Sequence, residues 1–424
     1  MSEIEDVSAF RLRAREWVAA NLPRLSDAGA GAGLGVVGRG HVDDAAWRRA
    51  RALQRLLFDG GFAGICYPRE YGGQGLTPEH QKAFTEVTAG YEMPLLLNIP
   101  TFSICGPVLL ELGSAELKRE HLPRVLSGEE VLIQFLSEPR GGSDLAGVTT
   151  RAVRDGDVFI VSGAKTWSSG AYAGDYATCL VRTDWDAPKH RGLTMLLMKI
   201  HQPGVTIRRI RQLDGNEEFC EEFLDDVEVP VSNVIGEVNG GWAVASRQLF
   251  HERNAVGGGS PYVSGGSLTG DGRPAPAAEL TRLVRRTGQA SDPRARELVA
   301  ESHLLSRVQE QLVERVVTGM QAQQLPPVAG SVIRLFAGLS SVRRAEIGVE
   351  LAGSYAAAGP APDGAEADGA PADGIRFLMR QGACLGGGST EMARNIISER
   401  MLGMPREYAA DRDVPFSQVR QARA

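Results

Sequence analysis

The sequence predicts an α+β fold in which one β-rich region separates two helical regions. Apolar residues recur at helical spacing from the N-terminus to about residue 130 and again beyond residue 239. Between these regions, short β-rich runs are separated by Asp-Gly and Pro-Gly turns. We therefore expect an N-terminal helical domain (residues 1–130), a central antiparallel β-domain (residues 131–238) and a C-terminal helical bundle (residues 239–424).

The N-terminal region contains two amphipathic runs that are separated by a Gly-rich loop at residues 27–40. The first run places these apolar residues on one helical face: Phe10, Ala14, Trp17, Val18 and Leu22. The second run repeats the pattern from Trp47 to Leu57, and the pair Gly60-Gly61 ends it. A further helix is expected over residues 115–126.

The central region is expected to form a sandwich or barrel of short strands. Its runs include VLIQFLSEP, YATCLVRT, LTMLLMKI and FLDDVEVP, and its turns include Asp155-Gly156, Pro203-Gly204 and Asp214-Gly215. The C-terminal region is helical to about residue 403, apart from a Gly/Pro/Ser loop at 257–277 and a low-complexity acidic stretch at 356–374 that we expect to be a mobile loop. Ligands are expected where these domains meet.

The composition argues against several classes of function. The 424-residue chain has a formal net charge of −6 and no run rich in Lys and Arg, so we do not expect nucleic-acid binding. Its five cysteines form no CxxC pair, which predicts buried reduced thiols rather than disulfides or a metal site. No signal-peptide core and no run of about 18 uninterrupted apolar residues is present. A cytoplasmic protein without membrane contact is the expectation.

Two polar segments could carry chemistry. In QFLSEPRGGSDL (134–145), Gly141-Gly142 permits a close turn, after which Ser143 offers a hydroxyl and backbone N–H groups to a ligand. In GAKTWSSGAYAGDY (163–176), a flat indole, Trp167, lies beside hydroxyl groups, an arrangement that suits a flavin ring. From the residues alone, an ordinary polar turn and a core tryptophan remain open alternatives.

The ordered pair SEPxGGSD and GxKxWSSxxxxxD resembles the flavin-contacting β-domain of the acyl-CoA dehydrogenases. Three further segments are similar to that family and occur in its order: YPREYGGQG (67–75), LDDVEVPVSNVIGEVNGGW (224–242) and GGGSTEMARNIISERMLGMPRE (386–407). The resemblance covers nearly the whole chain. Several ordered motifs that agree are much more specific than a single Gly-rich loop.

The resemblance implies an FAD-dependent dehydrogenase that forms an α,β-double bond in an acyl thioester. In the family, a glutamate removes the α-proton and the β-hydrogen leaves as hydride to flavin N5, while hydrogen bonds to the thioester carbonyl stabilise the enolate. The resemblance also implies an electron-transferring flavoprotein as the electron acceptor. Acyl chain length, and whether the carrier is CoA or an acyl carrier protein, are not readable from the sequence.

The catalytic base is expected to be Glu252. The common family position for the glutamate matches Gly387 here, which has no side chain. A minority of the family, similar to isovaleryl-type enzymes, carries the glutamate on the first long helix after the β-domain, in the segment that matches QLFHERNAV. The alternative from the residues alone is an exposed glutamate paired with Arg253 or Arg247.

The resemblance assigns further contacts residue by residue. Arg253 and Ser143 match substrate-contacting positions, and Ser143 is also counted among the cofactor contacts. The other positions that match FAD contacts are Gln134, Leu136, Ser137, Trp167, Ser168, Ser169, Ser389 and Glu391.

Two family motifs that reach the FAD of a neighbouring subunit are missing. Arg-x-x-Phe-Gly has no counterpart in RLVRRTGQASDPRARELVAE (282–301), and Gln-x-x-Gly-Gly has none in VELAGSYAAAG (349–359). The chain is therefore expected to be a divergent homodimer or homotetramer, a subunit of a heterotetramer whose homologous chain carries the missing motifs, or an inactive partner. A flavin monooxygenase of the same fold is a further alternative, which Glu252 disfavours, and a scaffold protein without chemistry is the weakest.

Overall fold

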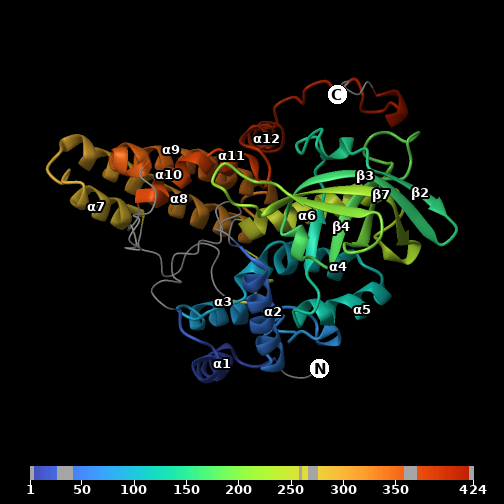
Figure 1. Ribbon diagram of the computed structural model, residues 1–424, viewed down its shortest axis with the longest axis horizontal. Helices are drawn as coiled ribbons and strands as arrows, with labels where there is room; N and C mark the ends of the chain where they lie inside the picture. Colours follow the sequence, from blue (N-terminus) through green and yellow to red (C-terminus); the bar gives the residue numbers. More distant parts are fainter. Residues whose placement is uncertain (1–3, 26–41, 257–259, 266–275, 358–369, 420–424) are drawn as a thin grey trace.

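The computed structural model describes residues 4–25, 42–256, 260–265, 276–357 and 370–419 (Figure 1). Helices come first along the chain, then a sheet, then helices again, so the predicted order and fold class are confirmed. The Gly-rich loop at 27–40 lies outside the described residues, as do most of the loop at 257–277 and residues 358–369 of the low-complexity stretch.

The N-terminal helices lie below the sheet in the view of Figure 1. They are α1 (Val7–Asn21), α2 (Asp44–Asp59), α3 (Pro78–Val87), α4 (Gly106–Leu112) and α5 (Ala115–Leu126). As the spacing predicted, α1 buries Phe10, Ala14 and Val18. Gly60 caps the end of α2, where the predicted stop occurs.

A π-helical segment, Asn98–Cys105, leads directly into α4. The stretch Leu95–Leu112 is long and apolar enough to cross a membrane by length and composition, but 72% of it is buried inside the protein. It therefore behaves as a core segment of the fold, against which α6 packs.

The central region forms one mixed sheet. Its strands are β1 (Leu132–Phe135), β2 (Arg151–Asp155), β3 (Val158–Ser169), β4 (Tyr176–Arg182), β5 (Leu193–Lys199), β6 (Val205–Arg209), β7 (Phe219–Pro230) and β8 (Val234–Ile235). The order is β6-β7-β3-β2-β4-β5-β8, and β1 pairs with β4. Most neighbours are antiparallel as expected, but β1 runs parallel to β4, and β2 meets β4 in parallel at one residue pair.

One apolar core joins the N-terminal helices to the sheet. It includes Phe102, Leu126, Ile133 and Leu196, all nearly inaccessible to solvent. Three cysteines are buried as expected (Cys105, Cys179 and Cys220), whereas Cys66 and Cys384 are partly exposed, and all five are free thiols. Because this core crosses the expected boundary near residue 130, the helices and the sheet are packed as one body.

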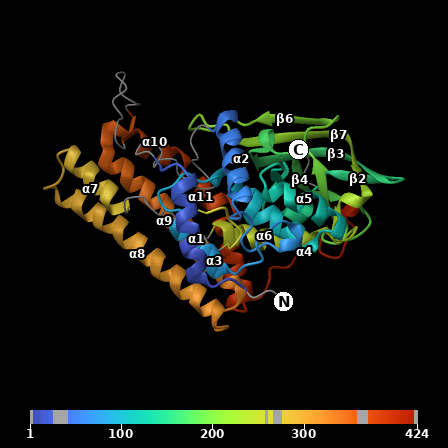
Figure 2. The ribbon, with the colours of Figure 1, turned by 90° about the horizontal axis from the view of Figure 1, so that it is seen from below.

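The C-terminal region consists of helices, most of which extend away from the sheet in Figure 1 and Figure 2, although the first, α6, packs against β4 and β5. They are α6 (Gly241–Val256), α7 (Pro276–Arg286), α8 (Pro293–Gln321), α9 (Gly330–Ala352), α10 (Ala370–Met379), α11 (Gly382–Leu385) and α12 (Thr390–Ile396). The expected loop at 356–374 ends earlier than predicted, because α10 begins at Ala370. Gly348 of α9 lets Asp373 approach closely, so packing against α9 favours the helix.

Candidate active site

The two motif segments meet at one end of the sheet. The Thr166 amide donates to the Ser137 carbonyl at 3.0 Å, which joins the segment after β1 to the end of β3. Gly142 folds back toward Ser137, since a Cβ at Gly142 would come within 3.1 Å of the Ser137 hydroxyl oxygen. The close turn predicted from Gly141-Gly142 therefore lies beside Ser137, and the exposed Ser143 follows the turn.

The side chain of Trp167 is exposed at a bulge in β3. The β3–β7 pairing shifts register between Thr166 and Ser168, and the backbone of Trp167 takes a φ of 66°, which non-glycine residues rarely adopt. Trp167 is 58% exposed, and its ring is nearly perpendicular to that of Phe219, with the two ring centroids 5.8 Å apart. Trp167 is therefore not a core residue, and an unusual backbone presents its ring outward.

Ser168 points into the domain instead. Its hydroxyl donates to Oε2 of Glu222 at 3.0 Å, and both side chains are buried. Burial raises the pKa of Glu222 to about 8, although Ser168 and Lys165 act in the opposite direction. A carboxyl group that is neutral near pH 7 thus lies directly behind the Trp167 bulge.

A buried ion pair supports the turn of the first motif. Lys165 donates to Glu138 at 3.0 Å and to the carbonyls of Leu136 and Leu180. Glu138 also accepts from the backbone and hydroxyl groups of Thr149 and Thr150. Burial would raise the pKa of Glu138, but Lys165 and these hydrogen bonds together lower it to about 2. The network fixes Leu136 and Glu138 on either side of Ser137.

Helix α6 brings Glu252 to the same end of the sheet. The amide of buried Gln248 donates to Oε1 of Gln134 and to the Thr178 hydroxyl, each at 2.9 Å. Glu252 lies one helical turn further on and is partly buried. Burial raises the pKa of Glu252, while Arg253, Arg334 and a hydrogen bond with Gln134 oppose this shift. Glu252 and the predicted flavin contact Gln134 are therefore neighbours.

The alternative pairing of Glu252 with Arg247 does not occur. Arg247 is held by Glu111 of α4, which its Nη2 reaches at 2.7 Å, and His251 lies 3.2 Å from the same carboxylate. These side chains occupy a different face of α6 from Gln248 and Glu252. Arg253 is exposed and close enough to Glu252 to influence its charge.

The C-terminal signature, the family-like segment at residues 386–407, places glycine at the position of the common family base. The backbone φ angles of Gly387 and Gly388 are 70° and 91°, which a glutamate residue would adopt only with strain. Arg334 of α9 donates to the Gly386 carbonyl at 2.6 Å. The hydroxyl of Ser389 accepts from the Met392 amide and caps α12.

Glu391, the other C-terminal residue expected to touch FAD, is exposed and pairs with Arg394 at 3.3 Å. It lines a hollow of about 440 Å³ together with residues of α9, α11 and α12. The hydrogen bonds of Ser389 and Glu391 are thus local to the C-terminal helices.

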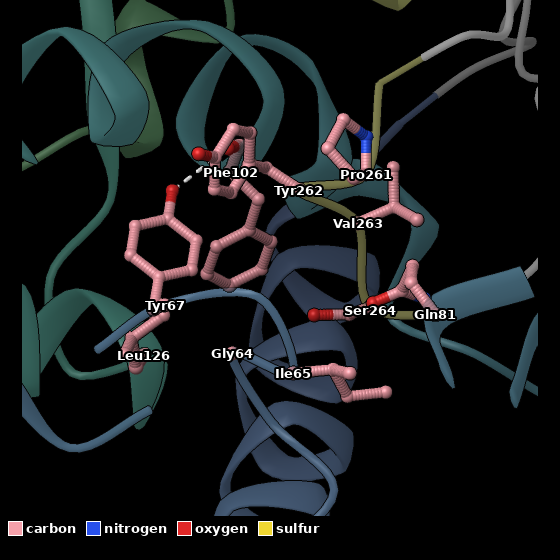
Figure 3. A pocket seen from close by; sticks show the side chains of 10 residues that line it. All are labelled: Gly64, Ile65, Tyr67, Gln81, Phe102, Leu126, Pro261, Tyr262, Val263 and Ser264. Atoms are coloured by element: carbon pink, nitrogen blue, oxygen red, sulfur yellow. Dashed lines mark hydrogen bonds between the residues drawn. The ribbon is translucent and has the colours of Figure 1, made fainter. Parts of the chain in front are cut away.

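The segment at residues 260–265 follows α6 and packs against the N-terminal region. Asn98 holds it by accepting from the Ser264 amide at 2.8 Å, and the Ser103 hydroxyl donates to the Tyr262 carbonyl at 2.8 Å. Figure 3 shows Tyr262 beside Tyr67, and their ring centroids are 4.9 Å apart. The side chains pack so closely that no room for a water molecule remains between them. Residues 260–265 are therefore tightly packed against the N-terminal region.

The structure thus links several predicted residues and adds others. Hydrogen bonds and chain continuity connect Gln134, Leu136, Ser137 and Trp167 with Glu252, whereas Ser389 and Glu391 make local contacts. Sequence reasoning missed Gln248, Glu222 and Arg334. A lone arginine in the apolar run SVIRLFAG of α9 was a usable signal for Arg334, because an isolated charge in such a run requires a partner.

These residues fit a flavin. The exposed indole of Trp167 provides an aromatic surface, and Gln134 and Ser137 lie on the neighbouring segment beside it. Ser168 is the exception, because its hydroxyl is committed to Glu222 and leaves only its backbone groups for such a contact.

Comparisons with known proteins place most of the chain in one family. Family models for the acyl-CoA dehydrogenase N-terminal, middle and C-terminal domains match residues 38–129, 134–227 and 239–402. The chain is 34% identical over 404 residues to the acyl-CoA dehydrogenase IpdE1 of Mycobacterium tuberculosis, an alignment that covers 95% of this chain and 99% of that protein.

Solved structures show the same likeness. The Tcur3481-Tcur3483 steroid ACAD matches with a TM-score of 0.73 at 28% identity, covering 96% of this chain and 100% of the other. The ChsE4-ChsE5 complex from Mycobacterium tuberculosis matches with a TM-score of 0.69 at 25% identity and the same coverage. The chain therefore belongs to the acyl-CoA dehydrogenase family of flavoprotein oxidoreductases.

Proposed function

We propose that this protein is an FAD-dependent dehydrogenase that forms an α,β-double bond in an acyl thioester, with Glu252 as the base that removes the α-proton. The observation that carries the proposal is the position of Glu252. It is a partly buried carboxylate beside Gln134, at the end of the sheet where Trp167 is exposed. In this site, Gly387 leaves the common base position without a side chain.

The surroundings of Glu252 suit proton abstraction. The α-proton of a thioester is weakly acidic, so a base works best when its pKa lies closer to the working pH than that of a free carboxylate. Burial raises the pKa of Glu252 in that direction. Gln248 donates to both Thr178 and Gln134, which fixes Gln134 beside Glu252. When bound, the flavin supplies the acceptor for the β-hydrogen.

Residues of the β-domain would hold the ligands. The indole of Trp167 offers a face to the flavin ring, and the segment Gln134–Ser137 borders it. The turn at Gly141-Gly142, with exposed Ser143 after it, is accessible to the carrier portion of the thioester. Arg253 at the exposed side of Glu252 would contact the substrate near the reacting carbons.

Anaerobic flavin absorbance tests the proposal. Purified protein is mixed with a panel of short, branched and cyclic acyl-CoA thioesters, and wild type is compared with Glu252→Gln and with Glu310→Gln, an exposed α8 glutamate paired with Arg307. We expect one class of thioester to bleach the flavin in wild type and in Glu310→Gln. Glu252→Gln should bleach at least about 1,000-fold more slowly, since the base is lost. Undiminished bleaching in Glu252→Gln would reject the base, and oxygen-dependent turnover in that variant would support the monooxygenase alternative.

We also propose that a second copy or a homologous chain completes the FAD site. The two cross-subunit motifs are missing, and large apolar side chains are exposed on the C-terminal helices, among them Leu304 of α8, Leu339 of α9 and Leu378 of α10. Two structural neighbours are described as pairs or complexes of chains. In the absorbance experiment, a colourless chain that gains flavin only with a homologous partner supports the heteromer, and a yellow homo-oligomer supports the self-sufficient form. An electron-transferring flavoprotein is the acceptor we expect for the reduced enzyme.

A further inference from the structure

Arg334 lies where the two family positions for the base converge. Its Nη2 donates to the carbonyl of Gly386, which precedes the empty base position Gly387. Its charge also acts on Glu252, the base that we propose instead. Arg334 thus hydrogen-bonds to the glycine loop of the C-terminal signature (residues 386–388), and its charge acts on the carboxylate of Glu252 on α6.

The guanidinium of Arg334 is tightly placed. A Cβ at Gly338, one turn further along α9, would come within 2.9 Å of Nη1 of Arg334 and within 3.0 Å of Thr390. Glycine at 338 therefore makes room for the arginine beside α12. The Nε atom of Arg334 is buried, and no hydrogen-bond partner for it occurs among the described residues. Buried donors are normally bonded, so this N–H is available to a ligand or to a rearranged carboxylate.

Arg334 is one of the ionisable groups that act on the carboxylate of Glu252. Arg253 faces Glu252 from its own helix, Arg334 faces it from α9, and the Cys105 thiol faces it from the π-helical segment. Arg400 acts on Arg253 in turn. Burial works against the charged carboxylate, and the two arginines facing it oppose that effect.

We propose that Arg334 is a positioning residue for catalysis: it fixes the glycine loop through Gly386 and places a positive charge that keeps Glu252 ionised. The inference rests on the proposed role of Glu252 as the base. It assigns Arg334 a function in which charge matters separately from the hydrogen bond to Gly386. Removing the charge should therefore change the pH dependence of proton abstraction, whereas loss of packing alone would lower the rate equally at every pH.

The test measures exchange of the substrate α-hydrogen for deuterium in D₂O. The probe is an acyl-CoA with sulfur in place of the β-carbon, which cannot form the double bond, so exchange reports proton removal without flavin reduction. The holoenzyme is assayed between about pH 5.5 and pH 9.5 as wild type, Arg334→Gln, Arg334→Met and Arg334→Lys. Arg344→Gln is the matched control, because Arg344 lies on the same helix and donates to Ser306 and Gln309 of α8.

We expect the midpoint of the pH profile to rise by about one unit in Arg334→Gln and Arg334→Met, because one of two opposing charges is lost. Arg334→Lys should keep the wild-type midpoint, and Arg344→Gln should match wild type. An unchanged midpoint in both neutral variants overturns the inference, as does an equal shift in Arg334→Lys. Should one neutral variant fail to fold, the midpoint of the other still decides. The failure of the base itself is recognised separately, because Glu252→Gln would then exchange as fast as wild type.

Discussion

Glu222 is a buried acid that the proposed reaction does not use. One of its carboxylate oxygens accepts from Ser168, and the other has no hydrogen-bond partner among the described side chains and backbone. The charge of nearby Lys165 is already taken up by Glu138 and two carbonyls. This explains why burial prevails and the pKa of Glu222 rises from 4.5 to about 8.

Stability at different pH values tests this assignment. The folded state binds the Glu222 proton more tightly than the unfolded state, so this group stabilises the fold below pH 4.5, and the contribution is lost as the pH rises toward 8. We expect Glu222→Gln to gain stability relative to wild type over that range, by on the order of 3 kcal/mol. Urea unfolding at several pH values measures the difference. Glu221→Gln, at the neighbouring position of β7, should show no such trend, and parallel curves for Glu222→Gln and wild type would contradict the assignment.

At the scale of elements, the bulge between β3 and β7 is the feature that shapes the site. The register shift turns Trp167 outward while Ser168 and Lys165 stay inside. An indole that is 58% exposed contributes little to the core, and its left-handed backbone has a cost in folding. The element therefore gives up some stability to present an aromatic face.

Replacing Trp167 separates these two effects. We expect Trp167→Ala to weaken flavin binding about fivefold, because an aromatic contact contributes on the order of 1 kcal/mol, while the melting temperature hardly changes. Trp167→Phe should restore most of the affinity. Flavin released on dilution and a thermal melt of the apoprotein give the two readouts. A large drop in melting temperature together with normal flavin binding would show that the indole is a structural residue after all.

The sequence predicted those elements whose pattern is local. Burial of Phe10, Ala14 and Val18 follows from helical spacing, and the stop at Gly60 from its glycine pair. The start of α10 within the expected loop was not predicted, because its stability comes from packing against Gly348 of α9. The parallel pairing of β1 with β4 depends on tertiary contacts that periodicity does not encode.

The site was predictable to the extent that the family motifs are contiguous. The motifs that contain Gln134, Trp167 and Glu252 each lie in one short segment, and resemblance supplied their expected roles. The contact of Gln248 with Gln134 joins residues that are 114 positions apart, and Arg334 reaches Gly386 across 52 positions. No local pattern specifies such pairs, so the structure was needed to find them.

At the scale of the whole molecule, the end of the described chain returns from the C-terminal helices to the β-domain. The Phe416 amide donates to the Ala187 carbonyl at 3.0 Å, and the Ser417 amide donates to the Trp185 carbonyl at 2.8 Å. The Phe416 ring is 3% exposed and covers the guanidinium of buried Arg182, whose Cζ lies 3.5 Å from the ring centroid. This contact ties the last segment to the sheet that carries the proposed site.

Removing the Phe416 ring should loosen this connection. We expect Phe416→Ala to lower the free energy of unfolding by about 3 kcal/mol, because a large buried aromatic is lost and the Arg182 charge is left without its cover. Tyr408→Ala is the matched control in the same segment, since Tyr408 is 89% exposed. Limited proteolysis should cut the C-terminal segment of Phe416→Ala first, while the rest of the chain resists. If Phe416→Ala and Tyr408→Ala were equally stable and equally resistant, the segment would lie on the sheet without stabilising it, and the connection between the helices and the β-domain would rest on α6 and the shared apolar core.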